Sequence, residues 1–417
     1  MLGEDLMSSH VLSGAVARGG TFDADLARER VHRLLRCAVE DEGVAGTVAL
    51  VRWRGQPVVQ EVQGWAQVSP HRRKMRLDTV FDLASLTKPL ATTAVALALV
   101  DQGQVALDEE VTRYLPELKT ARGAGVTFRR LLTHTSGLSG WRPLYASAQT
   151  PEGILEVIND LGMAYPPGSR FEYSDVGFIA LGIALERIAE RPLDHLAREL
   201  VFDKCGLTST GYSLQLEADR FAATEDGNEF ERRMAEWAGV HFDGWRRGCY
   251  PGQVNDGNAH YGLAGVSGNA GLFSTAGEVG ILAQMWLNRG ALDGERVLSA
   301  ASVQLATTDQ APAGGAARGL GWALASRTGP TLQELSRADA GFFPPSETPW
   351  KPRPSGELLA ERAFGHTGFT GTSVWCDPDT DLVGVLLTNA THPSVDLAGG
   401  LDRLRARFYN VLTASFT

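Results

Sequence analysis

The 417-residue sequence holds only four cysteines, widely scattered along the chain. No pair has the spacing of a metal site or of a disulfide framework, so we expect reduced thiols and no metal or other cofactor. No apolar run approaches the length needed to cross a bilayer, and residues 1–20 lack the basic-then-apolar pattern of a signal peptide. As written, the sequence therefore predicts a cytoplasmic protein without a membrane span, or a periplasmic or secreted one if a leader is missing.

Positive charge is also scarce. Lys and Arg total 39 against 49 Asp and Glu, a net charge of −10, which argues against a nucleic-acid partner or a basic membrane-binding face. The Gly-x-Ser-x-Gly elbow of α/β-hydrolases is missing, as are a P-loop and a dinucleotide fingerprint after a strand. His134, His241 and His260 lack paired metal spacing and are interpreted as structural. The expected partner is a small-molecule or peptide substrate, and the oligomeric state stays open.

Hydrophobic periodicity places strands near both ends of the chain. Residues 47–53 and 57–65 are β-rich runs around a short turn, which predicts a hairpin. Residues 362–377 and 382–389 alternate or run apolar like a second strand pair. Terminal helices are predicted on either side, over residues 21–42 and 395–412.

This order predicts an α+β fold in which both chain ends share a mainly antiparallel sheet covered by helices. We assign residues 21–84 and 361–417 to the sheet domain and residues 85–360 to an α-rich insertion domain. Within the insertion, residues 217–260 form a long irregular segment with three large aromatic residues. Such segments are usually functional or mobile, and we expect this one to border the site.

Ser85 and Lys88 stand three residues apart, just before an apolar segment over residues 91–100 that reads as a buried helix. That spacing puts both side chains on one face of a first helical turn, where Pro89 is tolerated. The helix dipole and burial are both expected to lower the pKa of the Lys88 amine, so that a neutral lysine can take the serine's proton. Taken alone, the pattern more often marks a helix cap and a surface lysine than a catalytic pair.

Two further stretches contain groups suited to catalysis. Tyr173 and Asp175 stand two apart before a helix, and a tyrosine hydroxyl beside an ammonium can pass a proton; a core tyrosine is the alternative. In the small-residue run 365–371, backbone can approach a ligand closely. Its N–H groups are candidate oxyanion donors, and His366 is a candidate cation or hydrogen-bonding group. The alternative is a glycine-rich edge strand.

The stretches Ser85-Leu86-Thr87-Lys88, Tyr173-Ser174-Asp175 and His366-Thr367-Gly368 occur in the order of the three motifs of penicillin-recognising serine hydrolases. The chain most resembles the class C β-lactamase-like group, which includes D,D-peptidases, family VIII carboxylesterases and a penicillin-binding-protein-4B-like branch. The resemblance covers most of residues 46–290 and 361–390. It implies a β-lactamase/transpeptidase-like fold and an acyl-enzyme mechanism on ester, D-Ala-type peptide or β-lactam substrates.

The resemblance also implies roles for individual residues. Ser85 is the acylated nucleophile, and Lys88 and Tyr173 together act as general base and general acid. The N–H groups of Ser85 and Phe369 form the oxyanion hole. The remaining matched residues hold the substrate; they are Thr367 and Gly368 on the strand, with Asp175 and His366 beside it.

Two positions depart from the family's usual pattern. Asp175 stands where the family most often has Asn, and His366 stands where β-lactamases have Lys. Both changes make the pocket less cationic and weaken carboxylate binding, so esterase-like activity is favoured. A D,D-carboxypeptidase or weak β-lactamase is the alternative. A catalytically silent scaffold is expected to have lost Ser85, Lys88 or Tyr173, and this chain keeps all three.

Overall fold

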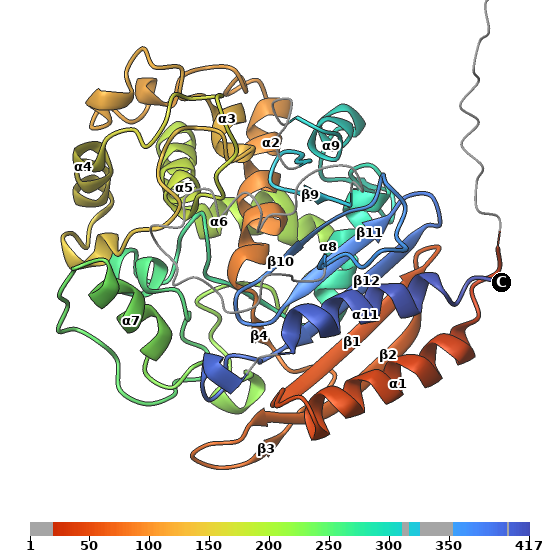
Figure 1. The fold of residues 1–417 in the computed structure, drawn as a ribbon. Coiled ribbons are helices and arrows are strands. Elements are labelled where there is room, and N and C mark those ends of the chain that lie inside the picture. Colours follow the sequence, from red (N-terminus) through yellow and green to blue (C-terminus); the bar gives the residue numbers. More distant parts are fainter. Residues whose placement is uncertain (1–19, 311–316, 326–352, 398–399) are drawn as a thin grey trace, which may run out of the picture.

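A seven-stranded antiparallel sheet forms the centre of the computed structural model, which describes residues 20–310, 317–325, 353–397 and 400–417 (Figure 1). In sheet order the strands are β3 (Arg73–Lys74), β2 (Gln56–Gln67), β1 (Gly46–Trp53), β12 (Leu382–Thr388), β11 (Ser373–Asp377), β10 (Phe364–Thr367) and β9 (Ala323–Leu324). The two ends of the chain meet where β1 pairs with β12, with Thr47 opposite Thr388 and Trp53 opposite Leu382. The predicted antiparallel sheet shared by both chain ends is confirmed.

The predicted strand over residues 362–377 is wrong in one respect, because it divides into two strands. β10 and β11 pair with each other through Thr367 and Ser373, and residues 368–372 turn the chain between them. Gly371 has a φ of +113°, a conformation that side chains disfavour. The glycines that suggested an extended backbone therefore make a tight turn.

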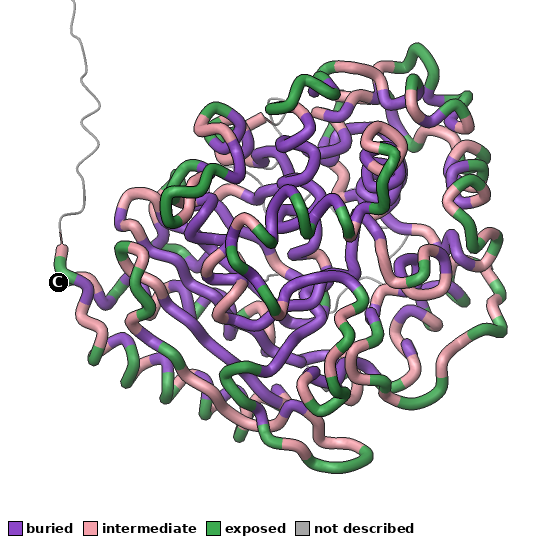
Figure 2. Tube along the Cα trace, turned by 180° about the vertical axis from the view of Figure 1, so that it is seen from behind, coloured by how far each residue is buried: buried purple, intermediate pink, exposed green. Residues whose placement is uncertain are grey.

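Helices cover both faces of the sheet because successive side chains of a strand point to opposite sides. In β1, Ala49 and Val51 join a core with the two terminal helices, while Val48 and Leu50 join the larger core on the other face. The helices concerned are α1 (Ala24–Glu40) and α11 (Leu401–Thr413) on one face and α8 (Ala276–Leu287) on the other (Figure 1). Figure 2 shows α1 alternating between buried and exposed positions, as an amphipathic surface helix should.

The remaining helices lie beside the sheet. They are α2 (Ala94–Asp101), α3 (Phe128–Leu132), α4 (Pro151–Leu161), α5 (Asp175–Ala189), α6 (Leu193–Ala197), α7 (Glu229–Trp237) and α9 (Ala300–Ala306). All of them except α7 contribute buried side chains to the larger core. Short strands complete the structure; they are β4 (Phe81–Asp82), β5 (Gly211–Tyr212), β6 (Leu272–Ser274), β7 (Ala291–Leu292) and β8 (Glu295–Arg296). Two segments inside the predicted insertion over residues 85–360 belong with the sheet. The helix α8 packs on its face, and β9 is its edge strand.

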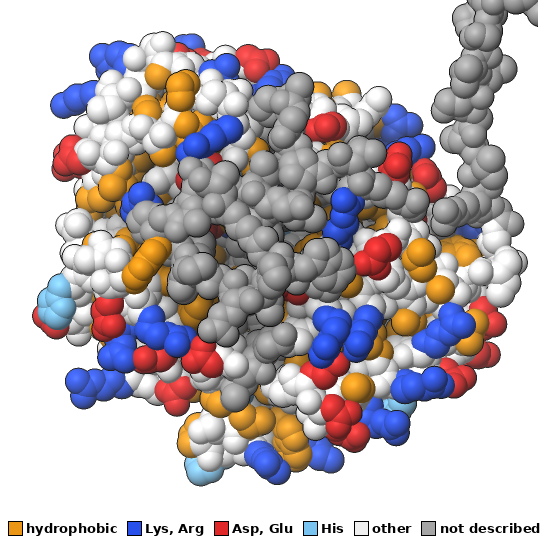
Figure 3. All heavy atoms as spheres, viewed as in Figure 1, with side chains coloured by type: hydrophobic (Ala, Val, Ile, Leu, Met, Phe, Trp, Pro, Cys, Tyr) orange, Lys and Arg blue, Asp and Glu red, His pale blue; other side chains and the backbone are white. Residues whose placement is uncertain are grey.

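Three further observations concern the surface, the helices and the first residues of the chain. Basic and acidic side chains are interspersed among the described residues on the face in Figure 3. None of the helices in the described part of the chain is both long enough and apolar enough to span a membrane. Residues 1–19, where the sequence lacks a signal-peptide pattern, lie outside the described residues.

Candidate active site

A sharp turn after β4 carries Ser85. Asp82 is buried and holds this turn with both carboxylate oxygens. Its Oδ1 accepts the N–H of Ala84 (2.8 Å) and its Oδ2 accepts the N–H of Asn255 (2.6 Å). Ala84 has a φ of +47°, which costs free energy for a residue with a Cβ and persists only where the surroundings impose it. Burial raises the pKa of Asp82 to about 6, even though both N–H groups oppose this shift.

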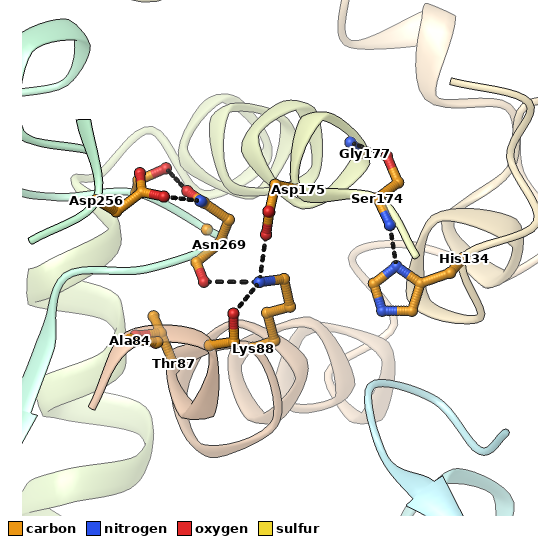
Figure 4. A network of polar contacts seen from close by, with 12 residues as sticks. Ala84, Thr87, Lys88, His134, Ser174, Asp175, Gly177, Asp256 and Asn269 are labelled. Atoms are coloured by element: carbon orange, nitrogen blue, oxygen red, sulfur yellow. Dashed lines mark hydrogen bonds and ion pairs between the residues drawn. The ribbon is translucent and has the colours of Figure 1, made fainter. Parts of the chain in front are cut away.

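Lys88 lies directly beneath Ser85 and is completely buried. Its Nζ donates to Ser85 Oγ (2.9 Å) and to the carbonyl of Asn269 (2.9 Å), and it lies 2.6 Å from Asp175 Oδ1 (Figure 4). Two of these contacts are hydrogen bonds and the third is an ion pair. The predicted helix start at Ser85 is a 3₁₀ turn, Ala84–Leu86, followed by a π-helical segment, Lys88–Thr93, that continues into α2.

The predicted neutral Lys88 is not what the structure shows. Burial pushes the pKa of the Lys88 amine down, but the Asp175 carboxylate and the Tyr173 hydroxyl together outweigh burial, and the net shift is upward. Lys88 is therefore an ammonium at neutral pH. Asp175, which stands where the family most often has Asn, contributes to this upward shift, because an asparagine would leave the Lys88 ammonium without its ion pair.

Tyr173 lies among cationic and aromatic groups. The Lys88 Nζ is 5.0 Å from its ring centroid, and the ring of His134 stacks on it at 4.5 Å. The His134 Nδ1 accepts the N–H of Ser174 (2.9 Å), which fixes the loop that carries Tyr173 (Figure 4). Burial, helped by the charges of Arg318 and Lys88, holds the pKa of His134 well below its usual range. Its neutral ring and buried contacts fit the structural role predicted for it.

His366 is buried on β10, with its ring 5.9 Å from that of Tyr173. Its Nδ1 lies 2.8 Å from the carbonyl oxygen of Thr367, to which it donates in the neutral ring. Burial, with Arg318 and Lys88 adding to it, keeps the pKa of His366 well below its usual range. At neutral pH the residue is therefore uncharged, and β10 carries no cation at this position.

The turn over residues 368–372 is fastened to the chain just before Ser85. Thr370 Oγ1 donates to the carbonyl of Asp82 (2.7 Å), and Thr372 Oγ1 donates to the carbonyl of Leu83 (3.0 Å). A Cβ on Gly368 would lie only 2.4 Å from the same Leu83 oxygen, so only glycine allows this approach. The turn thereby lies against the segment just before Ser85, and the oxyanion hole of the Ser85 and Phe369 N–H groups stays a prediction.

Arg405 holds the same turn from the opposite side. This buried residue of α11 donates through Nη2 to the carbonyls of Gly368 (2.6 Å) and Thr372 (3.0 Å). Sequence reasoning missed it, because an arginine among other charged residues of a terminal helix looks like a surface residue. Asp82 was missed too, although a lone carboxylate between Phe81 and Leu83 is a detectable signal of a buried polar contact.

Arg318 is the third missed residue. Its side chain is 1% exposed, and its Cζ lies 5.3 Å from the ring centroid of Phe171 and 5.6 Å from that of Tyr173. The sequence around it is rich in glycine and has no periodicity that would mark a buried position. Only the structure shows that this cation belongs to the site.

The segment over residues 217–260 is not irregular throughout as predicted, because it contains the helix α7, and it lies against the site at two places. Phe230 on α7 packs its ring 5.4 Å from that of Phe369, which is 45% exposed. Near the end of the segment, Asp256 accepts a hydrogen bond from the amide of Asn269 (3.2 Å), whose carbonyl binds Lys88. Burial raises the pKa of Asp256 to about 6, and the nearby Asp175 carboxylate adds to this shift. A role for this segment in substrate choice stays a prediction.

The three large aromatic residues singled out in this segment differ in their surroundings. Trp245 packs against Tyr145 at a ring distance of 5.8 Å, and this contact anchors the segment to the 3₁₀ turn Leu144–Ala146. Trp237 and Tyr250 are each 48% exposed. Within the described ranges, no cluster of three or more His, Cys, Asp or Glu side chains could hold a metal ion.

Comparison with known proteins gives one family and several similar proteins. The family model described as "Beta-lactamase" matches residues 31–407. A protein of Escherichia coli (strain K12) named "Putative D-alanyl-D-alanine carboxypeptidase" is 31% identical over 339 residues, which is 77% of this chain and 71% of that protein. The N-acetylmuramyl-L-alanine amidase of Bacillus subtilis (strain 168) is 30% identical over 375 residues, 85% of this chain and 79% of the amidase.

Solved structures share the fold at lower sequence identity. EstCE1, a hydrolase with promiscuous acyltransferase activity, superposes with a TM-score of 0.68 at 22% identity, over 94% of this chain and 99% of EstCE1. A penicillin-binding protein homologue from Caulobacter crescentus gives a TM-score of 0.67 at 20% identity, over 93% of this chain and 97% of the homologue. These similarities establish the β-lactamase/transpeptidase-like architecture.

Proposed function

The chain belongs to the β-lactamase family and is a serine hydrolase, and from this premise we propose that it hydrolyses carboxylic esters through an acyl-enzyme on Ser85. Ser85 Oγ attacks the ester carbonyl while its proton passes to a neighbouring base. The proton then goes to the departing alkoxide, which leaves as an alcohol. Water repeats the sequence on the acyl-enzyme, so that the acid is released and Ser85 regains its proton.

Lys88 and the 368–372 turn support this reaction in different ways. As an ammonium, Lys88 donates to Ser85 Oγ and orients it. The backbone N–H groups of Ser85 and Phe369 would stabilise the oxyanion as it forms, because fixed dipoles aimed at developing charge lower the barrier. Phe369 is exposed and packs against Phe230, which gives this side of the site an apolar rim suited to an acyl or alkyl chain.

The observation that carries the choice of ester is the state of His366. It is buried, neutral and turned to the carbonyl of its own neighbour. A substrate whose recognition depends on a carboxylate would find no cation at this position of β10. A neutral ester needs none.

A D-Ala-type peptide is the second candidate substrate. It is favoured by the name of the Escherichia coli relative, which covers most of the chain, and the amidase relative also bears the name of an enzyme that cleaves an amide. A C-terminal peptide carries a carboxylate, so this candidate needs a cation that His366 does not provide at neutral pH.

The test compares substrates on the same protein. We expect p-nitrophenyl butyrate to be hydrolysed with a higher kcat/KM than either nitrocefin or a peptide ending in D-Ala-D-Ala. Ser85→Ala should abolish all hydrolysis, while Ser169→Ala, at an exposed serine, should leave it unchanged. Faster turnover of the peptide than of any ester would assign the protein to the carboxypeptidases, and faster turnover of nitrocefin would assign it to the β-lactamases.

A further inference from the structure

Four consecutive residues, 255–258, bind four separate segments around Ser85. Three of them do so through one hydrogen bond each to a neighbouring segment; these bonds join the Asn255 N–H to Asp82 Oδ2 (2.6 Å), the Gly257 N–H to Glu231 Oε2 on α7 (2.8 Å), and Asn258 Oδ1 to the N–H of Leu144 (2.9 Å). The fourth residue, Asp256, is directed towards Lys88 through Asn269 (Figure 4). The segment therefore connects the turn before Ser85, α7 and the lysine.

The carboxylate of Asp256 is fixed by its own part of the chain. Its Oδ1 accepts the N–H of Ala259 (2.8 Å), and its backbone carbonyl accepts the N–H of His260 (2.9 Å). Both bonds belong to the start of the π-helical turn Asn258–Gly262. The other carboxylate oxygen, Oδ2, accepts the side-chain amide of Asn269 (3.2 Å), so a rigid group holds Asn269.

Asn269 lies in a glycine-rich stretch and is held from two sides. Its Nδ2 donates to Asp256, and its Oδ1 accepts the hydroxyl of Ser267 (2.7 Å). Gly271, two residues on, has a φ of +111°, and backbone of this kind has much conformational freedom. Side-chain bonds are therefore needed to fix the direction of the Asn269 carbonyl, which accepts the Lys88 Nζ (2.9 Å).

The Lys88 ammonium depends on that carbonyl for its alignment. A lysine side chain is flexible, and here its Nζ is held by hydrogen bonds to Ser85 Oγ and the Asn269 carbonyl and by the ion pair with Asp175. If the carbonyl moved, the Asp175 carboxylate would set the direction of Nζ, and the alignment of Nζ with Ser85 Oγ would be lost.

We propose that Asp256 is a positioning residue for the nucleophile, which acts through Asn269 to hold the carbonyl that fixes the Lys88 ammonium beneath Ser85 Oγ. The inference rests on the acyl-enzyme of the proposed function, but not on the identity of the acyl substrate. Its effect is on how fast Ser85 reacts, because the link from Asp256 ends at the group that orients Ser85 Oγ.

Two rates measure that effect. One is kcat/KM for p-nitrophenyl butyrate, and the other is the second-order rate constant for labelling of Ser85 by a fluorophosphonate, which needs no ester. Both should fall by roughly 10- to 100-fold in Asp256→Ala, since a misplacement of about 1 Å can cost a factor of that size.

Asp256→Asn separates positioning from a simple effect of charge. This variant removes the charge but keeps an oxygen for the N–H of Ala259. The Asn269 amide can turn over, so that its oxygen accepts from the introduced amide and its nitrogen donates to Ser267 Oγ. Asp256→Asn should therefore recover most of the rate that Asp256→Ala loses.

Asn269→Ala breaks the same link from its other end and should lower both rates by a similar factor. The double variant Asp256→Ala/Asn269→Ala should be no slower than either single variant, because each removes one shared link. The matched control is Asp243→Ala, at an exposed aspartate of the 217–260 segment that pairs with His241 (3.0 Å), and it should leave both rates unchanged. If Asp256→Ala does not fold, Asp256→Asn and Asn269→Ala still give the decision.

Three results would overturn the proposal. Wild-type rates in Asp256→Ala or in Asn269→Ala would mean that Thr92, which donates to the carbonyl of Gly268 (2.7 Å), holds the stretch without Asp256. Equal losses in Asp256→Asn and Asp256→Ala would assign the effect to charge alone. Losses that multiply in the double variant would show that Asp256 and Asn269 act independently.

The labelling rate also keeps this question apart from the choice of substrate. A wild-type protein that is labelled on Ser85 but does not hydrolyse p-nitrophenyl butyrate would contradict the ester proposal. The labelling rates of the same variants would still decide the role of Asp256.

Discussion

At the scale of single residues, the chemistry of the site depends on where charge is fixed. Lys88 is charged because Asp175 faces it, whereas His366 is uncharged because it is buried beside other cations. Ser85 and Lys88 were predictable from their spacing, since three residues on a helical turn place two side chains together. The charge states were not predictable, because they depend on neighbours far away in the sequence such as Arg318.

The rising limb of the pH–rate profile should belong to the Tyr173 and Lys88 pair and not to His366. The pKa of His366 lies below its usual range, so that ring has already lost its proton before the pH rises through neutrality. His366→Lys should therefore keep the limb in a kcat/KM profile between about pH 6 and pH 9. It should also improve binding of carboxylate-bearing esters, because it restores a fixed cation.

Tyr173→Phe is the companion variant, and it should lower kcat by roughly 10²–10⁴-fold if the phenol relays the proton. If the pH profile of kcat/KM for His366→Lys were flat between about pH 6 and pH 9, the general base would be His366.

At the scale of elements, the site depends on how two turns are fastened together. The hairpin of β1 and β2 and the terminal helices follow from periodicity and are present, but the last helix begins at Leu401 and not at residue 395, where the structure has a 3₁₀ turn, Val395–Leu397. The turn before Ser85 and the 368–372 turn could not be predicted, because their shapes come from contacts between segments nearly 300 residues apart. Hydroxyls of Thr370 and Thr372 make two of these contacts, and no local pattern in the sequence encodes them.

Arg405 should affect catalysis through the 368–372 turn. Arg405→Met removes the donor to two carbonyls of that turn, so the Phe369 N–H should lose its alignment with the oxyanion. Loss of one oxyanion donor costs about 10²–10³-fold in kcat, and we expect a decrease approaching that size with a smaller change in KM. The measurement is steady-state kinetics on p-nitrophenyl butyrate, accompanied by thermal unfolding.

Two variants make this result specific to Arg405. Arg403→Met removes an exposed arginine of the same helix that pairs with Glu42, and it should leave kcat unchanged. Arg405→Lys should recover part of the lost activity by restoring one donor. If Arg405→Met were less stable but equally active per folded molecule, α11 would be only a cover for the sheet.

At the scale of the whole molecule, segments distant in the sequence converge on Ser85. The sheet joins both ends of the chain, α11 holds the turn beyond β10, and the segment over residues 217–260 reaches the rim. The family resemblance predicted this architecture from three motifs. The role of the 217–260 segment could not be derived from its composition, because its aromatic residues fit a cover as well as a rim.

Phe230 is the residue through which this segment should influence substrate choice. Its ring packs on Phe369 at the site's edge, so Phe230→Ala should shift the kcat/KM profile across p-nitrophenyl acetate, butyrate and octanoate towards longer chains. Trp237→Ala, at the exposed end of the same helix, is the matched control and should leave the profile unchanged.

Trp245→Ala should instead lower Tm, because that ring packs against Tyr145. If Phe230→Ala left the chain-length profile of kcat/KM unchanged at equal stability, the 217–260 segment would have a structural role only.

Covalent labelling tests the central claim, that Ser85 is the acylated nucleophile of a serine hydrolase, most directly. The intact protein is treated with a fluorophosphonate and its mass is measured, and the modified residue is then located by peptide mapping. We predict a single adduct on Ser85 in the wild type and none in Ser85→Ala. An unmodified protein, or an adduct on any other residue that persists in Ser85→Ala, would contradict the account.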